Sequence, residues 1–157
     1  MTSKGTRSTG RAYALQLLYA RDGDPETDVT GAAVSWADLF ELEIDPAAQL
    51  FARELVAAAT ARTQEIDDLI TTSSKNWRID RMSRVDRNIL RLGACELLAF
   101  RDVPVKVVIN EAVELAKRFG TAESSAFVNG VLDRIATDIG RKDEPRGDEK
   151  GGGSRAS

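Results

Sequence analysis

The sequence has 157 residues, 42% of them hydrophobic, with a formal net charge of −3, and this length predicts one domain with a sizeable core. A single cysteine and no histidine exclude an intramolecular disulfide, Ser-His-Asp and Cys-His catalysis, and histidine-ligated zinc. No apolar run approaches the roughly 20 residues that span a bilayer or resembles a secretory signal, so we expect a cytoplasmic protein without a membrane partner.

Charge is unevenly distributed along the chain. Residues 1–21 carry four basic residues and no acid, residues 22–70 carry twelve acids against two arginines, and residues 71–91 carry six basic residues against two acids. Two basic segments on an acidic body are compatible with binding a polyanion at a local patch. The alternative, which charge alone favours, is that both segments are solvated helix faces.

The spacing of apolar residues predicts helices almost throughout and no strand. We expect a flexible basic arm over residues 1–10 and a first helix over about 11–21, which ends at a turn cluster of glycine and proline. A short helix is predicted from Trp36 to Leu42. The next helix starts near Asp45, which is followed by proline at the first helical position.

The middle and second half of the chain continue this pattern. An apolar stripe runs to about Ile70, and residues 71–74 mark a loop or a frayed helix end. Between Val85 and Leu98 the apolar residues lie almost all round the helix, which is typical of a central, buried element. Cys95 lies inside that helix and is expected to be a core thiol.

Two more helices are predicted after a chain break at residues 102–104, the second of them capped by Ser124 or Ser125. Residues 141–157 have charges of both signs, several glycines and no apolar anchor, and we expect them to be disordered. The sequence therefore predicts an all-α protein of about six or seven helices, with one helical domain over residues 11–140.

Phe127 lies at the edge of the apolar stripe of the last helix, close to Asn129 and Gly130. An edge aromatic beside a glycine can form a platform on which an unstacked base rests. The alternative is that Phe127 fills the core and Gly130 permits close helix packing. Because aromatic residues at helical spacing usually belong to the core, the residues alone favour that alternative.

Three arginines of the predicted central helix step by three and four residues and share one face: Arg84, Arg87 and Arg91. Arg81 joins them if the helix starts early enough. Such a row can engage successive phosphates or an acidic partner. Arg87 or Arg91 can instead pair with internal acids such as Glu96 or Glu111, and the sequence leaves both interpretations open.

Few residues in the sequence point to catalysis, because neither a nucleophile with an adjacent general base nor a set of metal ligands is evident. We therefore expect a binding protein without enzymatic activity and without a cofactor.

A series of short motifs runs through residues 85–136: Val85-Asp86-Arg87, Ile89-Leu90-Arg91, Glu96-Leu97, Val103-Pro104, Ile109-Asn110-Glu111-Ala112, Leu115-Ala116-Lys117 and Phe127-Val128-Asn129-Gly130-Val131-Leu132-Asp133. In order and spacing this series resembles the NusB family of bacterial transcription antitermination factors. Residues 11–19 also resemble the first helix of that family. The likeness covers most of residues 7–140, and its specific part lies in the second half.

The resemblance implies an all-helical fold of two packed helical subdomains and no catalysis. Family members bind the single-stranded boxA element of nascent ribosomal RNA together with the ribosomal protein NusE, and the complex helps RNA polymerase to read through terminators. By this likeness Phe127 is expected at the RNA-contacting surface, so the family resemblance favours the base-stacking interpretation over the core interpretation. The backbone around Asn129 is expected to read base edges. Arg7 and Arg11 are expected near the RNA path, and Asp86 close to the surface for RNA and NusE.

One departure from the family concerns its arginine cluster before the first helix, because here residues 8–10 separate Arg7 from Arg11. Fewer phosphate contacts predict weaker RNA binding with a smaller salt dependence. We expect the basic row of Arg81, Arg84 and Arg87 to replace some of these missing phosphate contacts.

The sequence allows comparison with two other functions beside RNA binding. A helical protein–protein adaptor with little RNA affinity of its own stays open. An RNA methyltransferase is disfavoured, because no Gly-rich segment of a cofactor domain is present. A homodimer is possible.

Overall fold

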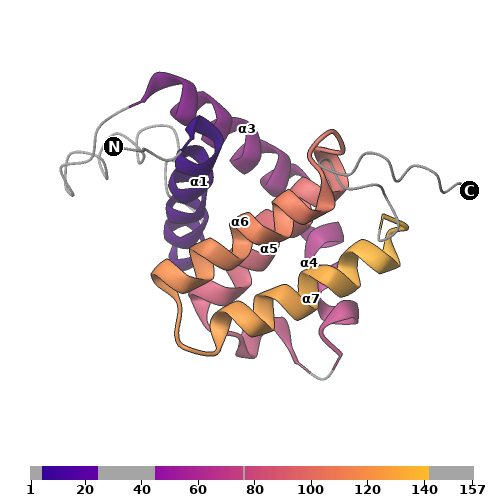
Figure 1. Cartoon of the computed structure of the whole chain (residues 1–157). Coiled ribbons are helices and arrows are strands. Elements are labelled where there is room, and N and C mark those ends of the chain that lie inside the picture. Colours follow the sequence, from indigo (N-terminus) through magenta and orange to yellow (C-terminus); the bar gives the residue numbers. More distant parts are fainter. Residues whose placement is uncertain (1–4, 25–44, 76, 142–157) are drawn as a thin grey trace, which may run out of the picture.

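A computed structural model describes residues 5–24, 45–75 and 77–141, and these residues are α-helical with no strand among them (Figure 1). The six helices found there are α1 (Thr6–Gly23), α3 (Pro46–Ala61), α4 (Thr63–Ser73), α5 (Arg84–Ala99), α6 (Val105–Phe119) and α7 (Ser124–Asp138). A 3-10 turn at Ile79–Arg81 precedes α5. The predicted all-α class is confirmed, whereas the helix expected at residues 36–42 lies outside the described residues.

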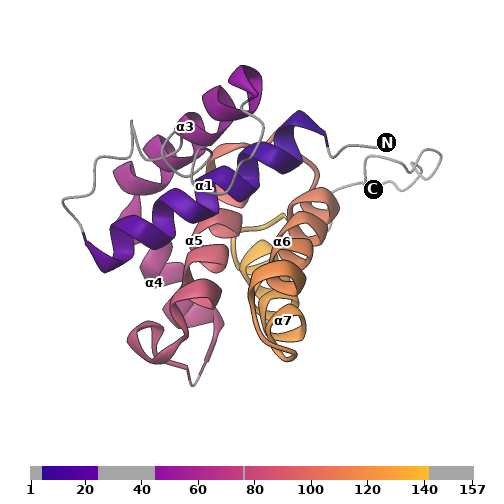
Figure 2. The same cartoon turned by 90° about the vertical axis from the view of Figure 1, so that its left-hand side faces the viewer.

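Helix α5 lies at the centre of the molecule. It packs against α1, α3 and α4 on one side and against α6 and α7 on the other, and each group also packs together (Figures 1 and 2). Its predicted all-round burial is confirmed, since Ile89, Leu90 and Leu97 are fully buried. Cys95 is a core thiol as expected, and burial together with the charge of Glu96 raises its pKa to about 12.

A side-chain cap marks the start of α3, and a glycine allows α1 to pack closely against that helix. The Asp45 carboxylate accepts hydrogen bonds from the backbone N–H groups of Ala47 and Ala48, so α3 starts where the sequence predicts. Helix α1 starts at Thr6, earlier than predicted, and residues 6–10 therefore belong to the helix and not to a flexible arm. A Cβ atom at Gly10 would lie 2.9 Å from the carbonyl oxygen of Ala48, so glycine permits α1 and α3 to approach.

Arg141 closes the described part of the chain. Gly140 adopts a positive φ of 81°, which glycine tolerates, and the chain turns so that the Arg141 side chain is fully buried. Its guanidinium donates hydrogen bonds to three carbonyl oxygens, that of Leu97 in the last turn of α5 and those of Arg101 and Val103 in the α5–α6 connection. The predicted boundary of the tail is therefore wrong at Arg141, which belongs to the fold. Residues 142–157 lie outside the described residues.

Candidate nucleic-acid interface

The residues predicted to contact RNA lie at two ends of the molecule. Arg7 and Arg11 belong to the start of α1, at the upper end in Figures 1 and 2. The starts of α5 and α7, which carry the other predicted residues, lie together at the lower end in both views. The predicted set is thus divided between two regions of the surface and the core.

Arg11 is in the core and not at the surface. It is 3% exposed, and its Nε and Nη2 atoms each lie 2.8 Å from an oxygen of Glu96, which is 1% exposed. Burial alone would lower the pKa of Arg11, but the hydrogen bonds and charge of Glu96 and the charge of Glu111 raise it on balance. The guanidinium therefore stays charged and joins α1 to α5, and the prediction that Arg11 contacts RNA is wrong.

Arg7 remains at the surface, one turn before Arg11. Its guanidinium carbon lies 4.8 Å from the centre of the Phe51 ring on α3, within the range of a cation–π contact. Ser8 on the same turn donates its hydroxyl hydrogen to Glu111 at 2.9 Å. The start of α1 thus presents one exposed arginine whose position is fixed by α3.

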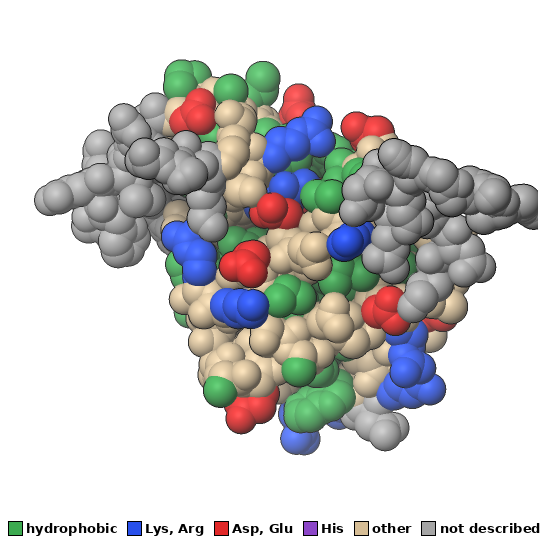
Figure 3. All heavy atoms as spheres, viewed as in Figure 1, with side chains coloured by type: hydrophobic (Ala, Val, Ile, Leu, Met, Phe, Trp, Pro, Cys, Tyr) green, Lys and Arg blue, Asp and Glu red, His purple; other side chains and the backbone are tan. Residues whose placement is uncertain are grey.

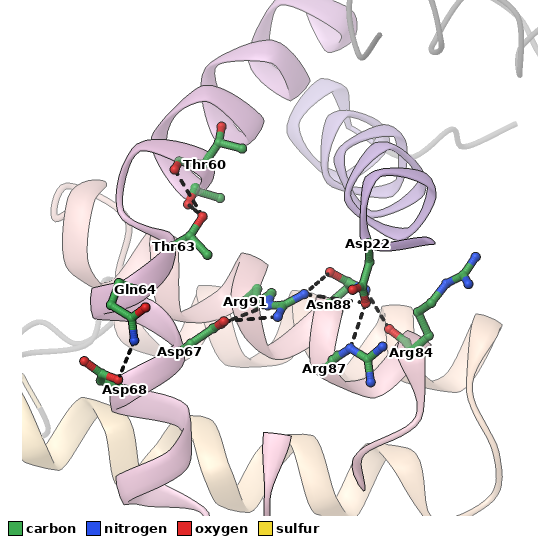
Figure 4. Close-up of polar contacts among 11 residues, drawn as sticks. Asp22, Thr60, Thr63, Gln64, Asp67, Asp68, Arg84, Arg87, Asn88 and Arg91 are labelled. Atoms are coloured by element: carbon green, nitrogen blue, oxygen red, sulfur yellow. Dashed lines mark hydrogen bonds and ion pairs between the residues drawn. The ribbon is translucent and has the colours of Figure 1, made fainter. Parts of the chain in front are cut away.

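Arg87 and Arg91 pair with acids of other helices, in agreement with the structural interpretation of the sequence. The acids are not the suggested Glu96 or Glu111. Arg87 Nε lies 2.7 Å from Asp22 Oδ2 at the end of α1, and Arg91 Nε lies 2.9 Å from Asp67 Oδ1 on α4 (Figure 4). The Asn88 amide also donates to Asp22, at 2.9 Å. Arg87 therefore holds α1 against α5, and its expected place in the RNA-contacting row stays a prediction.

A groove of about 210 Å³ lies between the end of α1, the α3–α4 junction and α5, and its lining includes Asp22, Asp67, Asn88 and Arg91. Partial burial pushes the pKa of Asp22 upward, but hydrogen bonds from Arg87 and Asn88 and the charges of Arg87 and Arg91 outweigh this effect. The pKa of Asp22 therefore lies below its ordinary value. The groove contains matched charges in contact with each other, which is typical of a structural network.

Two members of the predicted row remain exposed, Arg81 and Arg84. The Arg84 guanidinium carbon lies 4.1 Å from the centre of the Tyr19 ring, so the arginine rests on the last turns of α1. Asp86 occupies the first turn of α5, where its N–H donates to the Ser83 hydroxyl. The buried Oδ1 atom of Asp86 has no hydrogen-bond partner among the described residues.

Phe127 is half-buried near the start of α7, where it packs against the core and keeps part of its surface accessible to solvent. Asn129 is exposed, and a Cβ atom at Gly130 would meet nothing within 4 Å. Close helix packing therefore does not explain Gly130, and this part of the alternative interpretation is wrong. Asn129, two residues after Phe127, lies on a different face of α7, so the surface at this position consists of part of the Phe127 ring and the open backbone at Gly130.

Trp77, which the sequence analysis missed, packs against this surface. The centres of the Trp77 and Phe127 rings are 5.7 Å apart with an interplanar angle of 66°, an edge-to-face arrangement. On the face shown in Figure 3, hydrophobic side chains gather at the lower edge and basic side chains lie beside them. The available sequence signal was a tryptophan in a short basic segment outside any apolar stripe.

The chemistry available at this lower end is that of binding. Aromatic rings with nearby arginines and accessible backbone are the means by which proteins hold unpaired bases. Among the described residues no cluster of Cys, Asp and Glu is arranged to hold a metal ion. None of the described helices is long and apolar enough to cross a membrane.

Comparison with known proteins adds a family and a fold. The NusB family model matches residues 8–137. The transcription antitermination protein NusB of Myxococcus xanthus is 51% identical over 138 residues, which cover 87% of this chain and 99% of that protein. The NusB of Sorangium cellulosum is 48% identical over 142 residues, covering 90% and 99%.

Solved structures agree with this assignment. The fold is similar to that of T. maritima NusB, with a TM-score of 0.75, 36% identity, and coverage of 88% of this chain and 94% of that chain. It is also similar to a chain in a crystal structure of the antitermination factors NusB and NusE in complex with dsRNA, with a TM-score of 0.73, 29% identity, and coverage of 85% and 97%.

Proposed function

The chain belongs to the NusB family, and from this premise we propose that it is a non-enzymatic, RNA-binding transcription antitermination factor. It binds the single-stranded boxA element of ribosomal RNA transcripts together with the ribosomal protein NusE. The relatives named above are transcription antitermination proteins, and one structural neighbour is a chain in a complex of NusB and NusE with dsRNA. Both facts support the proposal.

The observation that carries the proposal is the position of Phe127. The ring is half-buried, so its position is held by the core while part of its surface is available to a ligand. Gly130, three residues along α7 from Phe127, leaves room for a ligand to approach the backbone beside the ring. An unpaired base can stack on the ring and form hydrogen bonds through its edges.

The partners follow from the same proposal. NusE would be bound as the second protein of a heterodimer, and the complex would act within the antitermination complex of RNA polymerase, in the cytoplasm. Arg7, Arg81 and Arg84 supply exposed positive charge for the RNA backbone, and Asp86 would lie near the surface shared by RNA and NusE.

The test is a titration of boxA RNA, with and without NusE, using the full chain and its Phe127→Ala variant. Loss of a stacked base is expected to weaken binding by about 1–3 kcal/mol. A Phe127→Tyr variant keeps the aromatic face and should retain most of the affinity. Val107→Ala, at an exposed apolar position on α6, is the matched control. Wild-type affinity in a folded Phe127→Ala variant would contradict the proposed mode of RNA contact.

One observation favours a second candidate, a protein–protein adaptor with little intrinsic RNA affinity. Arg11 and Arg87 are both engaged inside the fold, which reduces the cations available to RNA below the number that the sequence predicts. The same titration distinguishes the two functions. An adaptor binds NusE but shows no boxA affinity in the absence of NusE, whereas an RNA-binding factor shows measurable affinity by itself.

A further inference from the structure

The side chain of Trp77 is unusually accessible to solvent for a tryptophan. Three large hydrophobic side chains are exposed among the described residues, and Trp77, with 54% of its surface exposed, is the aromatic one. Tryptophan is usually highly buried, because its large apolar surface is costly to leave in water. Such a side chain at the surface indicates an interaction site.

The backbone that carries Trp77 is held in place. The Ser74 hydroxyl, on a residue that is 7% exposed, donates to the Trp77 carbonyl at 3.0 Å, and the Trp77 N–H donates to the Ser74 carbonyl at 3.3 Å. Lys75 adopts a left-handed conformation, with a φ of 60°, within the same turn. Because two hydrogen bonds to Ser74 hold the Trp77 backbone, a ligand that binds the ring loses little conformational entropy in fixing that residue.

Trp77 and Phe127 form one aromatic surface from two distant parts of the chain. Trp77 lies in the connection between α4 and α5, whereas Phe127 lies on α7, and their edge-to-face contact joins the exposed ring to the site proposed above. Each ring keeps part of its surface outside the contact, since Phe127 is half-buried and Trp77 is exposed. Two rings can therefore serve two neighbouring bases.

The charge around Trp77 selects the class of ligand. Lys75, Arg78 and Arg81 are exposed within seven residues, against Asp80 alone. Arg78 pairs with Asp80 at 3.0 Å, but both side chains are well exposed, at 70% and 63%. An exposed pair of this kind contributes little, so a phosphate can compete for the arginine. An aromatic ring among cations fits an unpaired nucleotide better than an apolar protein segment.

We propose that Trp77 is a second base-stacking residue, which with Phe127 holds neighbouring unpaired bases of a single-stranded RNA while Lys75 and Arg78 contact its phosphates. This inference rests on the proposed function and extends its binding surface by a residue that Phe127 alone does not imply.

Tryptophan fluorescence tests the inference directly, because the chain contains two tryptophans. In a Trp36→Phe variant of the full chain, Trp77 is the single tryptophan, and excitation at the long-wavelength edge of its absorption selects it over the two tyrosines. Titration with single-stranded boxA RNA should quench its emission and reduce its accessibility to acrylamide. The affinity of the Trp36→Phe variant should match that of the wild type.

Affinity measurements on substituted chains provide the second readout. Trp77→Ala should bind the RNA about 5- to 150-fold more weakly, whereas Trp77→Phe, which keeps a stacking face, should retain most of the affinity. Leu50→Ala, at another exposed apolar position on α3, should bind like the wild type. Circular dichroism and urea unfolding confirm that each variant is folded.

The outcomes separate this inference from the proposed function. If Phe127→Ala loses affinity while Trp77→Ala binds normally and Trp77 emission is unchanged, the inference is wrong and the proposed function stands. If Trp77→Ala weakens binding of NusE but not of RNA, the ring belongs to a protein interface and the inference is likewise overturned. If the wild type does not bind single-stranded RNA, both fail together.

Discussion

Arg11 and Glu96 form a two-point ion pair in the core, although each lies on a different helix and 85 residues separate them in the sequence. The two parallel hydrogen bonds, both of 2.8 Å, match the planar fork of the guanidinium to the two carboxylate oxygens. Glu111 on α6 adds a second acid at 3.8 Å. The pair therefore fixes the position of α1 relative to α5 and α6.

Removal of one partner should leave a charge buried without compensation. We expect Arg11→Ala to lower the free energy of unfolding by about 3–5 kcal/mol. The double variant Arg11→Met with Glu96→Leu removes both charges and should recover much of that loss. Urea unfolding followed by circular dichroism measures both. If the folded double variant also binds boxA RNA like the wild type, Arg11 has no part in RNA contact; a selective loss of affinity there would contradict the structural role.

The Asp22 carboxylate should make stability depend on pH in the acid range. Its pKa in the folded protein lies below the ordinary value of 3.8. The stabilisation that it contributes is therefore complete well above that value and is lost as the pH falls through the lower, folded pKa. Asp22→Asn should cost about 1–3 kcal/mol at pH 7, because hydrogen bonds to a charged group are lost.

Urea unfolding of the wild type and of Asp22→Asn between pH 7 and pH 2 checks this expectation. The difference between the two proteins should shrink toward zero at the acid end, where the wild-type carboxyl is protonated. Asp68→Asn, at an exposed position on α4, is the control and should differ little from the wild type at any pH. A difference that stays constant down to pH 2 would show that Asp22 acts through its shape and not through its charge.

Arg81 and Arg84 should contribute to the salt dependence of RNA binding. Each phosphate contact on a single strand adds about 0.7 to the slope of log affinity against log salt concentration. Replacing both arginines with alanine should therefore flatten the slope, and fluorescence anisotropy over a series of salt concentrations measures it. Arg53→Ala with Lys106→Ala removes the same charge from exposed positions on α3 and α6 and serves as control. An unchanged slope in the Arg81/Arg84 variant would rule out the compensation hypothesis.

Arg141 should stabilise the fold through the carbonyl groups that it satisfies. Its side chain is the hydrogen-bond donor to the carbonyls of Leu97 and Val103, at 2.8 Å and 2.9 Å in a buried setting. Arg141→Ala leaves these acceptors without that donor, and we expect a loss of at least about 2 kcal/mol in the free energy of unfolding. Arg53→Ala should be nearly neutral in the same thermal or urea measurement. Equal stability of both variants would contradict the anchoring role.

Signals local to the sequence were sufficient for the helical class and for several element boundaries. The start of α3 depends on Asp45 and the proline after it, and a cap acts within three residues of its helix. The burial of α5 follows from apolar residues all round one helix, which no solvated helix carries. The motif series around Phe127 indicated the family, which the family match over residues 8–137 confirms.

The partners of the buried charges and of the aromatic side chains at the candidate site were decided by the tertiary structure. Nothing near Arg11 in the sequence shows that Glu96 will face it, and nothing near Trp77 shows that Phe127 will pack against it. Helical periodicity states which face of a helix is apolar, but the partner of a polar group depends on which other helix lies opposite. That arrangement arises when the helices pack, because an arginine is buried only where carboxylate or carbonyl oxygens from elsewhere in the chain offset the loss of water, as Glu96 does for Arg11 and three backbone carbonyl groups do for Arg141.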